Sequence, residues 1–452
     1  MDILLVNPPS HDGDPYGKVI PLGLGSLWAV LTDHNFNAEI LDMFTQDTKE
    51  LIEVLQIHRP KIVGFSCLTE QRHWVVSLVK LTREILPNSL IILGGVHPTF
   101  TPDTMLTSTS ADLIIKGEGE IPLLEVCEMY LNRKSTDFSQ VNSVVYKSNT
   151  GEIIENKTGK RIKHLDHLPA FPYHKFEFNK YRFINNVLKE GRLPVKLDVS
   201  KITAVNYMSS RGCVYNCSYC SIQTFWQRRY YAHELNRVIQ EIIWLKNNKN
   251  VEFVWFWDDI FTINKKRIEE LCTLLIENKV NVYWGCTTRV DLVDEQLLKL
   301  MRRSGCILIS YGVESGSQQI LDNVQKKTKI EDIVYKIQLT MDLDISARVS
   351  LMVGNPGETD ETIAETIKLI QSVEPDLWSV NITKIYPGTD LYKKVKQQGL
   401  FSDELWLNTE EVPYYTLEHS EEELMNYQKL ILNELKIRRE IKKYHLSILD
   451  GE

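Results

Sequence analysis

Three cysteines crowd into a short segment near the middle of the chain, where their thiols can act together. Of the eight cysteines in the 452-residue sequence, Cys213, Cys217 and Cys220 lie within one stretch of eight residues. Thiolates are soft ligands, and three of them at this spacing suit an iron–sulfur cluster. A structural zinc ion would need a fourth ligand; His233 lies thirteen residues beyond Cys220, but no second cysteine or histidine pair completes a zinc-finger spacing. The thiols therefore favour a four-iron cluster in which one iron lacks a protein ligand and is open to chemistry.

Six β-rich runs alternate with helix-length segments from residue 202 onward. The runs cover residues 202–208, 251–257, 282–286, 307–312, 347–353 and 379–384. Such alternation predicts a parallel sheet covered by helices. Six units are fewer than the eight of a closed β/α barrel, so we expect a partial, TIM-like barrel over residues 201–398. The three cysteines follow the first run, which places them at the carboxyl-end rim where barrel active sites form.

A second alternating series occupies the start of the chain. Its β-rich runs cover residues 3–6, 38–42, 61–65, 90–93 and 113–115, with amphipathic helical segments between them. The pattern predicts a five-stranded, flavodoxin-like doubly wound α/β domain over residues 1–132. Ligands of such sheets bind over the carboxyl ends of the strands. Asn7-Pro8-Pro9, Ser66-Cys67-Leu68-Thr69, Gly94-Gly95-Val96-His97 and Lys116-Gly117-Glu118-Gly119-Glu120 follow these strands.

The remaining segments lack this rhythm. Residues 133–200 contain scattered aromatic residues and prolines and are predicted to form a connector at a domain junction. Residues 399–452 are helical and charged, and Ser420 with Glu423 forms a capping-box pattern. Leu424, Tyr427, Ile431 and Leu435 then keep one apolar face. We expect a small C-terminal helical appendage.

Composition limits the function classes. The net charge of -8 argues against a surface that neutralises a nucleic-acid backbone. The N-terminus has no basic stretch followed by an apolar signal segment, and no apolar run approaches the length of a membrane span. We therefore expect a cytoplasmic protein without nucleic-acid or membrane partners. Five cysteines stand alone in apolar or mixed segments, where a thiol acts as a small buried hydrophobe: Cys67, Cys127, Cys272, Cys286 and Cys306.

The cysteine pattern Cys-x3-Cys-x2-Cys, with Tyr219 before the last cysteine, resembles the signature of the radical S-adenosylmethionine (SAM) superfamily. Segments 256–261, 288–291, 311–317, 354–359 and 386–389 resemble further landmarks of that family. The resemblance implies that the open iron of a [4Fe-4S] cluster binds SAM, which is cleaved reductively to a 5′-deoxyadenosyl radical. It also implies SAM-binding roles for Tyr219, Arg289, Glu314, Arg348, Gly354 and Pro356.

Several of these residues have structural alternatives. Glu314 either accepts hydrogen bonds from the SAM ribose or is a rim charge paired with Arg289 or Arg348. Each arginine either holds a carboxylate of SAM or substrate or is structural. Gly354 either lets the backbone approach a ligand or serves a tight turn. Asp258 and Asp259 either bind substrate or cap the following helix.

The opening domain resembles the cobalamin-binding domain that precedes the barrel in one branch of the superfamily. The resemblance implies that cobalamin contacts Asn7, Pro8, Leu22, Gly23, Ser66, Thr69, Gly94, Gly95, His97, Gly117, Glu118 and Gly119. The pattern Asp-x-His-x-x-Gly, which supplies a lower axial histidine in other cobalamin proteins, does not occur in the chain. We expect cobalamin to bind with its own base displaced and without a histidine ligand, with His97 as a loop residue near the corrin; the alternative is a domain that has lost its cofactor.

Two cofactor modules in one chain predict a cobalamin-dependent radical SAM enzyme. The expected reaction is methylation of an unactivated carbon, or less commonly phosphorus, in a small-molecule biosynthetic intermediate. An external low-potential reductant of the flavodoxin or ferredoxin type is implied, because no such domain is fused to the chain. The alternatives are a related enzyme of ring formation, ring contraction or oxidation without methyl transfer, and a non-catalytic cobalamin sensor, which would not need the three cysteines.

Overall fold

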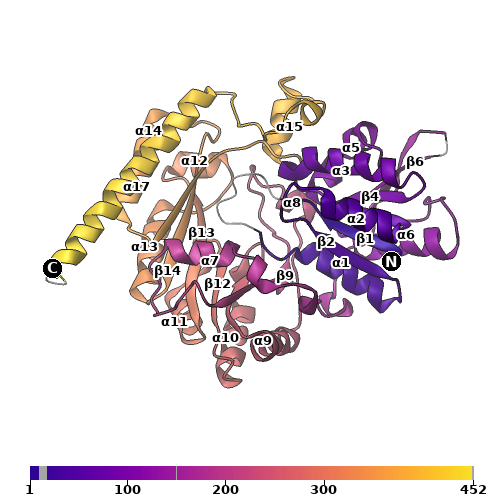
Figure 1. Cartoon of the computed structure of the whole chain (residues 1–452). Coiled ribbons are helices and arrows are strands. Elements are labelled where there is room, and N and C mark those ends of the chain that lie inside the picture. The colour runs from indigo at the N-terminus through magenta and orange to yellow at the C-terminus, as the bar shows by residue number, and fades with distance from the viewer. Residues whose placement is uncertain (10–17, 149, 450–452) are drawn as a thin grey trace.

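The computed structural model describes residues 1–9, 18–148 and 150–449. It contains two sheets that lie side by side, and most of their strands are parallel (Figure 1). The first sheet has the strand order β2-β1-β3-β4-β5-β6-β7 and the second has the order β15-β14-β13-β12-β11-β8. A short antiparallel pair, β9 (Ser210–Arg211) and β10 (Tyr231–Ala232), lies between the first barrel strand and the barrel's helices. Within the described residues, none of the helices has the length and apolar character needed to cross a bilayer.

The N-terminal sheet follows the flavodoxin-like order predicted from the sequence. Its parallel strands are β1 (Ile3–Asn7), β2 (Ala38–Asp42), β3 (Ile62–Ser66), β4 (Leu90–Gly94) and β5 (Leu113–Ile115). Helices α2 (Lys49–His58), α3 (Arg72–Ile85) and α5 (Pro102–Ser108) pack on one face through one buried cluster, and α1 (Leu22–Asp33) and α6 (Glu120–Cys127) pack on the other through a second. The short helix α4 (Val96–Phe100) follows β4. Side chains of one strand alternate between the two clusters, which is why the runs are apolar throughout.

The predicted connector contains strands and a helix that the sequence pattern did not predict. Strands β6 (Val144–Lys147) and β7 (Ile153–Glu155) add to the edge of the first sheet in antiparallel order, so that the sheet has seven strands instead of the expected five. Helix α7 (Phe183–Glu190) lies against the other sheet. Its Ile184, Val187 and Leu188 pack with barrel-strand residues such as Phe253 and Leu308 in one buried cluster.

The second sheet is the predicted open barrel. Its strands are β8 (Thr203–Tyr207), β11 (Val251–Phe256), β12 (Tyr283–Thr288), β13 (Cys306–Glu314), β14 (Ser346–Val353) and β15 (Leu377–Ile382), all parallel. Its covering helices are α9 (Leu235–Lys249), α10 (Lys265–Glu277), α11 (Glu295–Arg303), α12 (Gln318–Asn323), α13 (Ile330–Asp342) and α14 (Asp360–Ser372). Strands β8 and β15 end the sheet without pairing to each other, which leaves the barrel open on one side.

Residues 385–417, here called the strap, follow β15 and include α15 (Asp390–Gln397) and α16 (Leu405–Asn408). The strap has its own buried cluster, to which Leu391, Tyr392 and Trp406 belong. The buried guanidinium of Arg72 on α3 stacks on Trp406, 5.1 Å from the ring centre. It also donates hydrogen bonds to the strap carbonyls of Trp406, Thr409 and Glu411. The strap thereby joins the barrel to the N-terminal domain.

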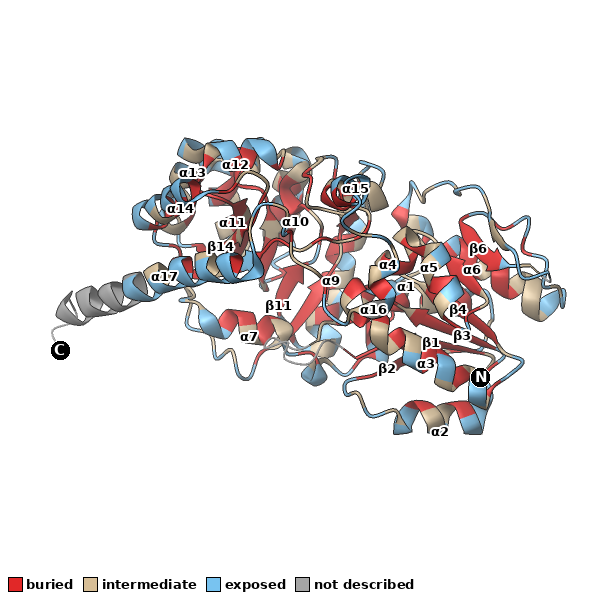
Figure 2. Cartoon of the chain, turned by 90° about the horizontal axis from the view of Figure 1, so that it is seen from above, coloured by how far each residue is buried: buried red, intermediate tan, exposed pale blue. Residues whose placement is uncertain are grey.

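The C-terminal helix α17 (Glu421–Leu449) begins at the predicted capping box. The backbone N–H of Ser420 donates to Glu423 at 2.7 Å, and the backbone N–H of Glu423 donates to the Ser420 hydroxyl at 3.3 Å. Leu424 and Ile431 are buried in the barrel core, as the apolar face of the helix predicts. The described part of the helix runs along α14 (Figure 2). Residues 450–452 of the predicted appendage lie outside the described residues.

Candidate functional site

The three cysteines lie in a loop after β9, at the carboxyl-end rim of the barrel. Cys213 and Cys217 are buried and Cys220 is half-buried. Burial raises the pKa of Cys213 to about 11 and that of Cys220 to about 12, and the neighbouring thiols contribute to both shifts. Burial disfavours ionisation of these thiols when no metal is bound. A bound metal is therefore needed to hold them as thiolates.

The donor set of three neighbouring thiols suits an iron–sulfur cluster. Among the described residues, no three His, Cys, Asp or Glu side chains are placed to share one metal ion. A mononuclear zinc site brings its ligands within bonding distance of one centre, whereas each thiolate of a [4Fe-4S] cluster binds a different iron and the sulfurs lie further apart. The chemistry and the placement of Cys213, Cys217 and Cys220 therefore fit an iron–sulfur cluster.

Two aspartates at the end of β11 fix the path of the cysteine loop. Asp258 accepts hydrogen bonds from the backbone N–H and the hydroxyl of Ser209, both at 2.7 Å, and from the hydroxyl of Ser210. Asp259 accepts a hydrogen bond from the backbone N–H of Gly212 at 2.8 Å. Both contacts lie just before Cys213, so the aspartates position the loop. The N-cap residue of the following helix α10 is Asn264 and not either aspartate.

Arg289 is buried behind the loop as part of its support. Its guanidinium donates two hydrogen bonds of 2.9 Å to Asp291 and one of 2.6 Å to the carbonyl of Lys326. It also lies over the Tyr215 ring at 3.9 Å and places one nitrogen 4.0 Å from the sulfur of Cys217. This geometry matches the structural alternative for Arg289, since a cation beside the sulfur offsets negative charge on the thiolates.

Tyr219 and Glu314, both predicted to bind SAM, meet at the rim. The Tyr219 hydroxyl donates to the Glu314 carboxylate at 3.0 Å, and the ammonium of Lys326 donates to the same oxygen at 2.8 Å. Glu314 ends β13 with a φ of 73°, an uncommon conformation for a residue with a side chain. Its ion-pair partner is Lys326, and Arg289 pairs with Asp291 instead. No local pattern in the sequence marks Lys326.

Tyr219 and Glu314 line a cavity of about 410 Å³ at the barrel mouth, here called the barrel cavity. Its other lining residues are Met352, Asn381, Ile382, Lys384, Tyr386, Tyr414 and Gln428. Arg348, Gly354 and Pro356 are not among the described residues that line it. Arg348 lies on β14, in register with Ser310 of β13.

Gly354 and Pro356 belong to a loop after β14 that the C-terminal segment holds. Glu358, in the same loop, accepts hydrogen bonds from the backbone N–H groups of Gly354 and Asn355. Its second carboxylate oxygen is buried without a partner among the described residues, and burial raises the pKa of Glu358 to about 7. His419 donates from Nε2 to the Glu358 carbonyl at 2.7 Å. The side chain of Leu424 occupies the space beside Gly354.

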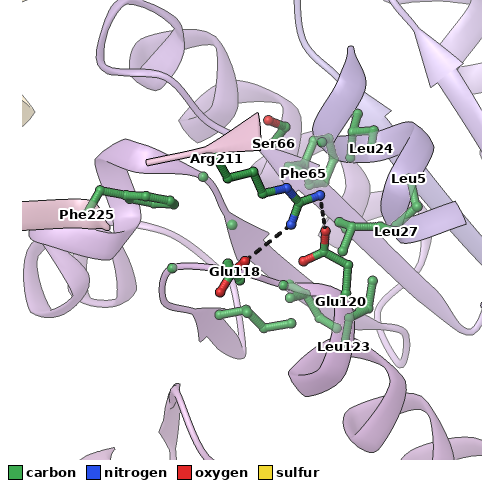
Figure 3. Close-up of a pocket in the computed structure, with 18 of the residues that line it drawn as sticks. Leu5, Leu24, Leu27, Phe65, Ser66, Glu118, Glu120, Leu123, Arg211 and Phe225 are labelled. Carbon is green, nitrogen blue, oxygen red and sulfur yellow. Dashed lines mark hydrogen bonds and ion pairs between the residues drawn. The ribbon is translucent and has the colours of Figure 1, made fainter. Parts of the chain in front are cut away.

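A second cavity of about 220 Å³, here called the domain cavity, lies between the first sheet and helices α1 and α6 (Figure 3). Seven of the twelve residues predicted to contact cobalamin line it: Gly23, Ser66, Gly94, Gly95, Gly117, Glu118 and Gly119. Apolar side chains form most of the remaining wall, among them Leu5, Leu24 and Phe65. A Cβ at Gly23 would meet no atom within 4 Å, so the cavity is open at that point.

The chemistry of the lining of the domain cavity fits cobalamin. An apolar slot that runs down between a sheet and its helices accommodates a flat aromatic base, and backbone at glycine positions allows a macrocycle to approach closely. Within the described residues, no histidine lines the cavity. The glycine-rich, mainly apolar lining thus fits cobalamin.

The other five predicted contacts lie outside the lining of the domain cavity. Asn7 donates to Asp42 at 2.9 Å, the Pro8 carbonyl accepts from Lys18 and Gln71, and Leu22 packs in the barrel core. Thr69 contacts the fully buried His97, whose ring packs edge-on against Trp406 of the strap at 5.4 Å. Burial, and then Arg72, lowers the pKa of His97 to about 3, so its ring is neutral. In the structure His97 contacts the strap instead of the cavity in which the corrin was expected.

A buried ion-pair network joins the domain cavity to the cysteine loop, and the sequence patterns missed it. Arg211, two residues before Cys213, lies 2.8 Å from Glu120 and 3.3 Å from Glu118 (Figure 3). Ser26 donates to Glu120 at 2.8 Å, and Arg161 lies 3.7 Å from Glu118. Burial opposes ionisation of Glu120, but Arg211 more than offsets it and holds the pKa of Glu120 below its ordinary value. The Gly117-Glu118-Gly119-Glu120 motif is the local sequence feature that marks this ion-pair network.

Barrel residues also form part of the wall of the domain cavity. Met208, Arg211, Phe225 and Trp226 line it together with residues of the first sheet. Phe225 and Trp226 follow the cysteine loop directly. The fold and the two sites thus define a class of α/β protein with two cofactor modules. A doubly wound cofactor-binding domain faces an open barrel, and the barrel carries three thiols that can bind an iron–sulfur cluster.

Comparisons with known proteins give the family. The model of the radical SAM superfamily matches residues 207–370, and that of the B12 binding domain matches residues 13–127. The chain is 27% identical over 414 residues to an uncharacterized methyltransferase of Pyrococcus horikoshii, which covers 90% of this chain and 85% of the relative. It is 30% identical over 404 residues to the anaerobic magnesium-protoporphyrin IX monomethyl ester cyclase of Rubrivivax gelatinosus, which covers 87% of this chain and 70% of the relative.

Solved structures share the fold. The methyltransferase TsrM of Kitasatospora setae, with cobalamin and a [4Fe-4S] cluster bound, superimposes with a TM-score of 0.71 at 18% identity, over 88% of this chain and 78% of that one. The cobalamin-dependent enzyme OxsB, with aqua-cobalamin and SAM bound, gives a TM-score of 0.71 at 18% identity over 88% of this chain and 60% of that one. The chain belongs to the cobalamin-dependent branch of the radical SAM superfamily. Its cofactors are a [4Fe-4S] cluster, SAM and cobalamin.

Proposed function

We propose that this radical SAM enzyme methylates an unactivated carbon, or phosphorus, of a small-molecule biosynthetic intermediate. The observation that carries the proposal is the wall shared by the two modules, where Arg211 and Trp226 of the barrel line the cavity of the cobalamin domain. A carrier bound there has the cysteine loop as its neighbour. Relatives named as methyltransferases, such as the cytidylyl-2-hydroxyethylphosphonate methyltransferase of Streptomyces wedmorensis at 25% identity, support this reaction type.

The residues have distinct proposed roles. When bound, the cluster with SAM and the cobalamin supply radical generation and methyl carriage. Cys213, Cys217 and Cys220 hold the cluster, and Arg289 offsets the charge beside Cys217. Tyr219, Glu314 and Lys326 form a hydrogen-bonded set that orients SAM. Arg348, Gly354 and Pro356 are proposed to assist from β14 and the loop after it. The apolar wall of the domain cavity excludes water from the carrier.

Methyl-labelled SAM tests the proposal. The reconstituted enzyme is incubated with SAM that carries a labelled methyl group, and the cobalamin is extracted and analysed by mass spectrometry. We expect labelled methylcobalamin. Cobalamin that stays unmethylated while 5′-deoxyadenosine accumulates would rule out methyl transfer and leave the rest of the family assignment in place.

A cyclase is the second candidate, because the Rubrivivax gelatinosus relative is a cyclase and is the one that reaches 30% identity among the relatives described above. The two reactions differ in product mass. Methylation adds one CH2 to the substrate, whereas ring formation or oxidation adds none. Mass spectrometry of products formed from an extract of candidate metabolites separates them.

We also propose a cytoplasmic location and an external low-potential reductant of the flavodoxin or ferredoxin type. The support is chemical, since reductive cleavage of SAM needs an electron at low potential and free thiols persist in a reducing compartment. Reduction of the cluster by purified flavodoxin, followed by its electron paramagnetic resonance spectrum, tests the partner.

A further inference from the structure

The barrel cavity has two polar ends. One end is the set formed by Tyr219, Glu314 and Lys326, in which the carboxylate of Glu314 and the ammonium of Lys326 neutralise each other at 2.8 Å. The other end lies beyond β15, two strands away, because β13 pairs with β14 and β14 with β15. Neighbouring strands are separated by about 4.8 Å, so the two ends lie roughly 10 Å apart along the rim.

Lys384 supplies the charge at the second end. It follows β15 and lines the cavity with Asn381, Tyr414 and Gln428. Its ammonium lies 5.9 Å from the centre of the Tyr414 ring, and no carboxylate among the described residues pairs with it. The nearest cavity acid, Glu314, is already engaged by Lys326. Lys384 is thus a half-buried cation whose charge the described part of the chain leaves unbalanced.

The neighbours of Lys384 suit recognition of an anion. Asn381 is exposed within the cavity, and Tyr386 is fixed by the hydrogen bond of its hydroxyl to Glu70 of the N-terminal domain at 2.7 Å. Gln428 donates to the carbonyl of Val380 at 2.8 Å, which holds α17 against the end of β15. A cation that no carboxylate balances inside a cavity is offset most favourably by a negative group on the molecule that binds there.

We propose that Lys384 binds an anionic group of the substrate, a carboxylate or a phosphate, and that this contact holds the substrate at the end of the cavity opposite Tyr219 and Glu314. The inference rests on the proposed function, because it assigns the barrel cavity to the substrate of that reaction. It narrows the substrate to small molecules with a negative group about 10 Å from the SAM-binding end.

Binding of simple probes tests the charge requirement without a known substrate. Phenyl phosphate, benzoate and the neutral benzamide are titrated into the reconstituted enzyme with SAM bound, and their dissociation constants are measured by ligand-observed NMR. A charge-assisted hydrogen bond changes affinity by roughly ten- to a hundredfold. We therefore expect Lys384→Gln to weaken binding of the anionic probe by at least about tenfold, to leave benzamide unchanged, and Lys384→Arg to retain most of the affinity.

The matched control is Lys429→Gln, which removes the same charge from an exposed position of α17 outside the cavity lining. It should bind all three probes like the wild type. The ratio of phenyl phosphate to benzoate affinity shows which anion the site prefers. Equal anion affinity in Lys384→Gln and wild type overturns the proposal, and so does a loss of SAM affinity in that variant, since Lys384 would then hold the SAM carboxylate. Probe binding does not depend on methyl transfer, so failure of the labelling experiment and failure of this inference are distinguishable.

Discussion

Arg211 is the residue on which the contact between the two cofactor sites depends most directly. It comes from the barrel, two residues before Cys213, and its guanidinium is almost fully buried against Glu118 and Glu120 of the other domain. Buried pairs contribute little net stability, but they penalise any arrangement that separates them. The pairing of Arg211 with Glu118 and Glu120 therefore fixes the position of the cysteine loop relative to the domain cavity.

Replacement of Arg211 by leucine leaves Glu120 buried without its cation and Glu118 with the more distant Arg161 alone. We expect Arg211→Leu to lower the free energy of unfolding of the apoprotein by about 3 to 5 kcal/mol, measured by urea denaturation. Arg303→Gln, at an exposed position of α11, should change it by less than about 0.5 kcal/mol. A combined Arg211→Leu, Glu118→Gln and Glu120→Gln variant should recover part of the loss; an unchanged denaturation curve for Arg211→Leu alone would contradict the role.

Glu358 predicts a distinct dependence of stability on pH. Burial raises its folded-state pKa from 4.5 to about 7, so between these values the folded state keeps a proton that the unfolded state has released. The free energy of unfolding therefore falls as the pH rises through this window, by about 3 kcal/mol from this group. Glu358→Gln should remove that slope, as followed by urea denaturation at pH 4.5, 6 and 8. Glu365→Gln, on the exposed face of α14, should keep the wild-type slope; a shared slope in both variants would exclude Glu358 as its source.

The residues found from the sequence and those missed differ in how local their evidence is. The cysteines can be recognised from the sequence because three candidate ligands fall within eight residues. Lys326 supports Glu314 from twelve residues away, and Arg211 meets Glu118 across 93 residues, so only the folded chain brings them together. His97 follows a strand end and was expected near the corrin, but Trp406 covers it from the strap. Distant pairs of this kind leave no local pattern.

The strap is the element that ties the two domains from the outside. Arg72 of α3 donates to three of its carbonyls, and Leu391 donates from its backbone N–H to the carbonyl of Ser218 in the cysteine loop at 3.2 Å. Its own buried cluster includes Tyr219 at the edge. A single segment thus contacts the cofactor domain and the cluster loop at once.

Loss of Arg72 should loosen the strap in particular. We expect Arg72→Leu to increase amide hydrogen exchange of residues 405–411 at least about tenfold, because each hydrogen bond from a charged donor contributes about 1.5 to 3 kcal/mol. Lys80→Gln, at an exposed position of the same helix, should leave exchange in that segment unchanged. Equal protection in both variants, measured by mass spectrometry, would show that the apolar contacts of Trp406 hold the strap alone.

Regular elements of both sheets were predictable because alternation of apolar runs and helical segments is a strong local signal. The six barrel strands and the order of the first five strands followed from it. Strands β6 and β7 did not, since they are short and their pairing at the sheet edge depends on β5 and not on their own pattern. Helix α7 is also short, and it is stabilised by packing against Phe253, Leu308 and other barrel residues.

At the scale of the whole molecule, the two cofactor sites should load separately. The cysteine ligands all come from one loop, and the domain cavity is lined mainly by the first sheet and its helices. We expect Cys217→Ala to lose iron, sulfide and the visible absorbance of the cluster, while it keeps a full equivalent of cobalamin. Cys272→Ala, which changes a buried thiol on α10, should keep both. Reductive cleavage of SAM by Cys217→Ala would refute the assignment of the cluster site.

The position of the strap along the chain has a consequence for biosynthesis. A ribosome makes the cobalamin domain first, the cysteine loop next, and residues 385–417 only after both. Domains fold as units during synthesis, so each cofactor site is complete before the segment that fastens one to the other has left the ribosome. The growing chain therefore passes through an interval in which both sites have been made and the strap does not yet join them.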